Sequence, residues 1–132
     1  MFTKYCLAIQ VIVNKKIFKG FVHDRVMYTG NCDCTHRRRI DHRKLIGNTM
    51  FAVETDEHGH SNYDKEDEII RYDDLFMIHS GKWIYIRFNP DITRTDKTNI
   101  DYRIGVLLKM MESQIHRIMS DENQELVEII KI

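Results

Sequence analysis

The stretch from Arg37 to His60, RRRIDHRKLIGNTMFAVETDEHGH, joins a basic run, a short apolar segment and a group of carboxylates. Residues 49–53 are apolar or β-branched and lead directly into acidic residues, which is the pattern of a β-strand. The pair Gly47-Asn48 precedes them and signals a tight turn. The sequence therefore predicts a β-hairpin around this turn, with the apolar segment as its second strand.

This hairpin would gather three carboxylates. Successive strand side chains point to opposite faces, so Phe51 and Val53 should lie on one face, with Glu54 and Asp56 on the other. Asp41 lies across the turn, and the hairpin would bring it back toward these two acids. Two like charges about 4 Å apart repel by roughly 4 kcal/mol at an effective dielectric near 20, so the group requires water, a proton or a cation. Oxygen ligands favour Mg²⁺ or Mn²⁺ over zinc. Two interpretations stay open, a metal site and a solvated strand end.

The order of motifs along the chain resembles a known family. The motifs are the basic run with Asp41, the acids Glu54, Asp56 and Glu57, then His60, Tyr63, residues 68–71 (EIIR) and residues 83–91 (WIYIRFNPD). This set spans roughly residues 24–91 and resembles endonuclease-like proteins common in large DNA viruses, a family similar to restriction endonucleases and to very-short-patch-repair nucleases. The resemblance implies an α/β, restriction-endonuclease-like fold, with a mixed central sheet of about four strands flanked by helices.

The same resemblance implies a metal-dependent endonuclease that hydrolyses phosphodiester bonds of DNA with Mg²⁺ or Mn²⁺. By the family pattern Asp41 is the first acid and Glu54 the second. Asp56 stands where a lysine is usual, and the patch-repair branch uses histidines instead, so the proton acceptor would be His58, His60 or Asp56. The missing lysine also favours an alternative: a catalytically inactive relative that serves as a nucleic-acid-binding module or a virion-structural or interaction protein.

Basic side chains accompany the acids. Arg37, Arg38 and Arg39 form a run beside the first acid, which is either a solvated surface or a site that positions a phosphate backbone. Arg71 is either the partner of the glutamate three residues before it or part of the active-site wall. Arg87, at the end of an apolar strand, would hold a phosphate, order the acids or pair with the aspartate at position 91.

Composition indicates one domain. A chain of 132 residues with 42% hydrophobic residues is long enough to bury a core, so we expect a single restriction-endonuclease-like domain over residues 1–132. No segment is long and apolar enough to cross a membrane. Twenty basic residues balance twenty acidic ones, so binding of nucleic acid would depend on local basic patches. No nucleotide-cofactor motif is present.

The cysteines indicate the compartment. There are three, Cys6, Cys32 and Cys34, and no secretory leader precedes them, which predicts an intracellular, reducing location such as a host cytoplasm or a virion. Cys32, Cys34 and His36 are zinc-ligand types, but one residue between the cysteines is too short a spacing for a usual structural zinc site.

Further elements follow from periodicity. They are an apolar run at 5–13 that fits a strand or a helix, a short strand at 26–28, an amphipathic helix at 65–79, a strand at 83–88, a helix at 104–119, and a second C-terminal helix after a break at 120–124. The strand at 83–88 should place Trp83, Tyr85 and Arg87 on one face. The methionine-rich stripe of the C-terminal helices is either core or the face of a homodimer.

Overall fold

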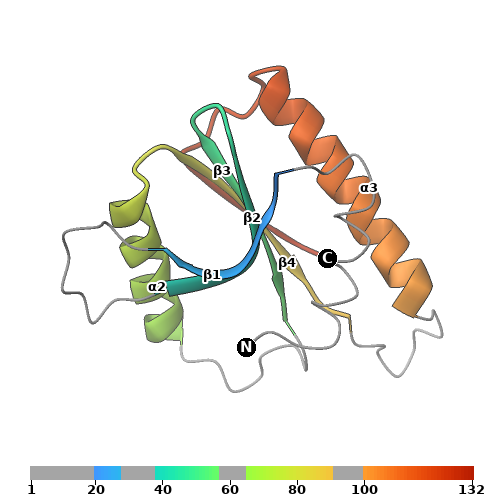
Figure 1. Cartoon of the computed structure of the whole chain (residues 1–132), viewed down its shortest axis with the longest axis horizontal. Coiled ribbons are helices and arrows are strands. Elements are labelled where there is room, and N and C mark those ends of the chain that lie inside the picture. The colour runs from blue at the N-terminus through green and yellow to red at the C-terminus, as the bar shows by residue number, and fades with distance from the viewer. Residues whose placement is uncertain (1–19, 28–37, 57–64, 91–99) are drawn as a thin grey trace.

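A computed structural model of the chain describes residues 20–27, 38–56, 65–90 and 100–132. In chain order these form β1 (Val22–Met27), β2 (Arg38–Ile46), β3 (Thr49–Thr55), α2 (Lys65–Ile78), β4 (Lys82–Phe88), α3 (Ile100–Met119) and β5 (Val127–Lys131) (Figure 1). The strands make one sheet in the order β1-β2-β3-β4-β5, antiparallel from β1 to β3 and parallel from β3 to β5. The predicted α/β class with a mixed sheet is confirmed, with five strands in the described part of the chain instead of about four.

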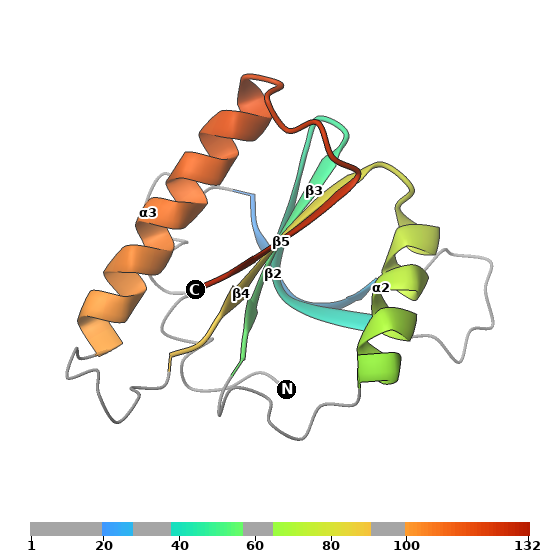
Figure 2. The ribbon, with the colours of Figure 1, turned by 180° about the vertical axis from the view of Figure 1, so that it is seen from behind.

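The two helices cover opposite faces of the sheet (Figure 1, Figure 2). Each one follows a strand and returns the chain to the next parallel strand, as parallel pairing requires. Because β3, β4 and β5 follow one another across the sheet while α2 and α3 lie on different faces, the two crossovers have opposite hands. One of them is therefore left-handed, which is rare among such connections. With this arrangement, a helix covers each of the two apolar faces of the central strands.

The β2–β3 hairpin is closed by the predicted turn. Residues 42–46 of β2 pair with residues 49–53 of β3, and Gly47-Asn48 makes the two-residue connection. Gly47 has φ of 59°, the left-handed value that a hairpin turn requires at its first central position.

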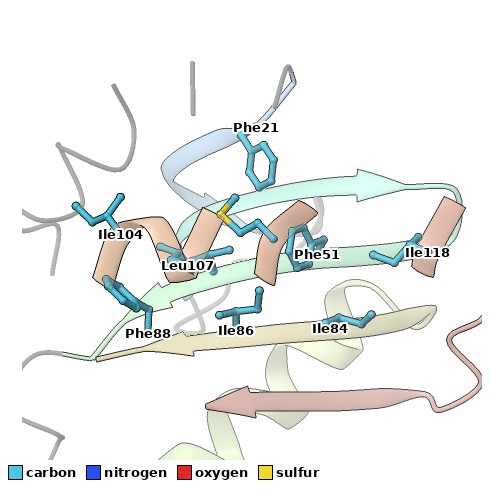
Figure 3. Close-up of a cluster of buried hydrophobic side chains, with 10 residues drawn as sticks. Phe21, Phe51, Ile84, Ile86, Phe88, Ile104, Leu107 and Ile118 are labelled. Atoms are coloured by element: carbon cyan, nitrogen blue, oxygen red, sulfur yellow. The ribbon is translucent and has the colours of Figure 1, made fainter. Parts of the chain in front are cut away.

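Alternating side chains build two cores. The α3-side core contains Phe51 and Val53 of β3 and alternate residues of β4, packed under α3 (Figure 3). The α2-side core contains Ala52 of β3 together with Trp83 and Tyr85 of β4, packed under α2. The predicted division of both strands into two faces is confirmed. Each large apolar side chain buried in this way contributes about 1.5–3 kcal/mol.

The C-terminal segment corrects one prediction. Leu126 to Ile130 was predicted to start a second C-terminal helix, but Val127–Lys131 is strand β5, parallel to β4. The four apolar residues of this segment lie one or two positions apart, a spacing that fits either period, and three of the four are β-branched. The edge of β4 offers backbone hydrogen-bond partners to this segment, and the local sequence pattern does not reveal them. A homodimer through two C-terminal helices is therefore no longer supported in that form.

Two glycines allow a matched stability prediction. A Cβ on Gly81 would lie 2.5 Å from the Asn48 carbonyl oxygen and 2.6 Å from His79 Nε2, whereas a Cβ on Gly105, inside α3, would meet nothing within 4 Å. We expect Gly81→Ala to lower the free energy of unfolding by about 1–3 kcal/mol, because the turn must shift. Gly105→Ala should raise it by about 1 kcal/mol through helix propensity. Urea unfolding of both variants measures this, and equal effects would contradict the turn geometry.

A histidine pair lies between β1 and β2. The Nδ1 atoms of His23 and His42 are 2.8 Å apart and the rings meet edge to face, so one nitrogen donates to the other. His42 is fully buried. Burial, and secondarily the charge of His23, lowers the pKa of His42 from 6.5 to about 3, and burial also lowers the pKa of His23.

From the burial of this histidine pair we predict that the folded state loses stability as the pH is lowered. Between pH 6.5 and about 3 the unfolded chain binds a proton at His42 that the folded state excludes. The stability is therefore fully present above pH 6.5 and falls as the pH is lowered, by up to roughly 1.4 kcal/mol per pH unit. His42→Gln should flatten the dependence of unfolding free energy on pH between 6.5 and 4. Parallel curves for wild type and His42→Gln would contradict the prediction.

No helix in the described residues is long and apolar enough to cross a membrane. The apolar run 5–13, the cysteine segment 32–36 and residues 57–64 and 91–99 lie outside the described residues. The predictions that rest on them stay predictions.

Candidate functional site

The pairing of β2 with β3 ends where the acids begin. The last paired residues are His42 and Val53, so Asp41 and Glu54 are the next opposite residues. Asp41 Oδ2 accepts a hydrogen bond of 2.9 Å from the Thr55 amide. The hairpin thus brings Asp41 back to the end of β3, as predicted from the Gly47-Asn48 turn. The Asp41 carboxylate accepts the hydrogen bond that a backbone carbonyl of the neighbouring strand would otherwise accept.

Glu54 is buried on the α2 side of the sheet. Arg71 of α2 donates to Glu54 Oε1 in a close ion pair. Burial raises the pKa of Glu54; the charges of Arg71 and Arg87 oppose this rise, and the charge of Asp41 adds to it. Asp41 and Glu54 are therefore electrostatically coupled carboxylates on adjacent strands.

Arg87 is the centre of a second set of contacts. Its Nε and Nη2 donate to the two carboxylate oxygens of Asp56, at 2.7 and 2.9 Å, which is a bidentate pair. Its Nη1 donates to Glu68 and to the Tyr72 hydroxyl of α2. Burial alone would lower the pKa of Arg87, but the hydrogen bond and charge of Asp56 raise it above its ordinary value. Arg87 stays charged and ties three elements together.

Aromatic rings close one side of the cluster. Tyr72 packs on Tyr85 with ring centroids 4.8 Å apart, and Tyr85 stacks on Trp83 at 5.0 Å. The Tyr72 hydroxyl donates to Glu68 at 3.3 Å, and burial raises the pKa of Tyr72 to about 12. Tyr72 is not among the site residues predicted from the sequence. Its position four residues after Glu68 could have indicated that it belongs to the cluster, because that spacing places both side chains on one face of a helix.

The cluster contains both carboxylates and guanidinium groups. Its carboxylates belong to Asp41, Glu54, Asp56 and Glu68, and its guanidinium groups to Arg71 and Arg87. Neighbouring carboxylates from two strands are a donor set that suits Mg²⁺ or Mn²⁺.

The three predicted metal ligands are not equivalent. Both oxygens of Asp56 accept from Arg87, whereas one oxygen of Glu54 lies 4.0 Å from Arg87 Nε and the other pairs with Arg71. Among the residues that the structure describes, no group of three or more His, Cys, Asp or Glu side chains is arranged to hold a metal ion.

The structure brings together five of the predicted site residues, which are Asp41, Glu54, Asp56, Arg71 and Arg87. Arg38 and Arg39 belong to β2, opposite Met27 and Val26 of β1, but their side chains lie outside the described part. The candidates Arg37, His58 and His60, and the alternative partner of Arg87 at position 91, also lie outside it. In the described part of the chain Arg71 pairs with Glu54, and Arg87 pairs with Asp56.

Comparison of the chain with protein-family models, with curated proteins and with solved structures found no match.

Proposed function

We propose that this chain is a divalent-metal-dependent endonuclease with a restriction-endonuclease-like fold. The observation that carries the proposal is the coupling of Asp41 on β2 with Glu54 on β3, at the point where the two strands separate. One acid on each of two adjacent strands is the arrangement that the resemblance implied. The mixed sheet with β3 and β4 joined through α2 is compatible with that fold.

Asp41 and Glu54 would hold one Mg²⁺ or Mn²⁺ ion. The bound ion supplies a Lewis acid for a phosphoryl oxygen and a water of lowered pKa. Arg71 is held against Glu54 at the same place and is the side chain best suited to meet a phosphate oxygen. Asp56 is engaged by Arg87, so we assign proton transfer to His58 or His60, which follow the cluster directly in the sequence.

The substrate would be nucleic acid, and we propose DNA. Since the formal net charge is zero, attraction to the phosphate backbone must be local, and Arg37, Arg38 and Arg39 precede the acid of β2. Arg87 would act as a positioning residue that fixes Asp56 and Glu68, because both carboxylates bond to its guanidinium.

One observation favours a second candidate function. Both guanidinium groups of the cluster bind carboxylates of the same cluster, and no lysine takes part in its described contacts. A site with this internal pairing would also suit a catalytically inactive relative that binds nucleic acid or another protein. Such a relative would bind DNA and cut none.

The test is cleavage by the purified chain. Supercoiled plasmid, branched duplex, single-stranded DNA and RNA are incubated with Mg²⁺, Mn²⁺ or a chelator. Metal-dependent cutting that the chelator abolishes is expected for the enzyme. Binding of the same substrates without cutting, in either metal, would replace the enzyme with the binding module.

A further inference from the structure

Strand β5 forms one edge of the sheet in the part of the chain that the structure describes. The sheet order places it last, next to β4 (Figure 2). Ile132 donates its amide to the Arg87 carbonyl and accepts from the Asn89 amide, both at 3.0 Å, and the Leu126 carbonyl accepts from Trp83 at 2.8 Å. Backbone groups alternate along a strand, so those of Val127, Ile129 and Lys131 point away from β4. Within the described residues no strand pairs with that side of β5.

Three apolar side chains are exposed along this edge. Leu126 is 60% exposed, Val127 41% and Ile129 43%. Edge strands in natural proteins are usually protected by proline, by a bulge or by charges within the strand. Here the strand residues whose backbone groups point away from β4 are Val127, Ile129 and Lys131, and the acid Glu125 lies in a bend just before the strand. A strand of this kind is suited to pairing with another strand.

We propose that β5 pairs with β5 of a second copy of this chain, antiparallel about a two-fold axis. The register that places Val127 opposite Ile129 of the partner subunit also places Glu125 opposite Lys131 of the partner subunit. Each contact then occurs twice, as two-fold symmetry requires. The pairs join outward-pointing backbone groups, so the two five-stranded sheets become one continuous sheet.

Charge complementarity selects a second copy as the partner. The order from Glu125 to Lys131 is complementary to itself only when reversed, which is the antiparallel arrangement. On the other face the same register brings Glu128 opposite the partner's Glu128. Each of these carboxylates is already held by Arg117 of its own chain, with two contacts of 3.1 Å, so its charge is compensated.

Sedimentation equilibrium across a wide range of chain concentrations tests this interface. Wild type should be a dimer, and Ile129→Lys should weaken the dimer by roughly tenfold or more, because a charge replaces an apolar cross-strand contact. Ile69→Lys is the matched control, since Ile69 is an exposed isoleucine on α2, and it should leave the dimer unchanged. Circular dichroism confirms that each variant is folded. A wild type that is monomeric throughout would overturn the proposal.

Charge reversal tests the register itself. Glu125→Lys and Lys131→Glu should each weaken self-association by roughly tenfold, because each places like charges opposite each other twice. An equimolar mixture of the two single variants should form a heterodimer more readily than either variant forms a homodimer, and the double variant should recover wild-type association. Dimers that are insensitive to both reversals would show that another surface mediates association and would refute the β5 pairing.

Discussion

Arg87→Ala is expected to lower the free energy of unfolding by about 3–5 kcal/mol, the largest stability effect among the charged residues considered. Arg87 is 5% exposed and binds Asp56 and Glu68 together with the Tyr72 hydroxyl. Its removal takes a buried guanidinium away from the partly buried carboxylates of Asp56 and Glu68, which both pair with it. Urea denaturation at neutral pH measures the loss.

Arg117→Ala is the matched control for this prediction. Arg117 also pairs with a glutamate, Glu128, but its side chain is 31% exposed, and exposed ion pairs contribute about 1 kcal/mol or less. Equal losses for the two arginines at neutral pH would show that the cluster does not depend on Arg87.

Asp41→Asn is expected to reduce metal-dependent cleavage by about 10²–10³-fold or more, because a cation contributes several kcal/mol to the transition state. The asparagine keeps an oxygen that can accept from the Thr55 amide, so the strand end should stay intact. Removing the charge also relieves repulsion of Glu54, so the variant should be somewhat more stable than wild type without metal. Nicking assays and thermal melts give both values.

Asp73→Asn provides the control for this second prediction, since Asp73 is exposed on α2. It should leave both cleavage and stability unchanged. DNA affinity of Asp41→Asn should be retained or increased, because a negative charge near the phosphate is lost. Undiminished cleavage by Asp41→Asn would place the chemistry elsewhere on the chain.

The predictions that depend on local sequence are the ones that the structure confirms. Gly47-Asn48 and the alternation at Phe51 and Val53 fix the hairpin and its faces within a few residues, and no distant partner is required. The return of Asp41 to Glu54 follows from the same hairpin.

Contacts and secondary-structure elements that depend on residues distant in sequence could not be predicted. Arg87 binds Asp56 because β3 and β4 are adjacent and in a register that pairs Glu54 with Arg87. The sequence left this contact open beside a phosphate or the aspartate at position 91. β5 is a strand because β4 offers an edge, although its apolar spacing also fits a helix. Tyr72 enters the cluster through α2 docking on the sheet, which the helical period alone does not specify.

Binding of Mn²⁺ is the measurement that tests the central claim most directly, since the claim is that Asp41 and Glu54 form a divalent-cation site. Isothermal titration of the metal-free chain should give saturable binding of one ion per chain, together with a rise in melting temperature, because a ligand that binds the folded state stabilises it. Asp41→Asn should abolish both, and Asp73→Asn should retain both. Wild type that binds no Mn²⁺ at millimolar concentration, or Asp41→Asn that binds as wild type does, would contradict the assignment.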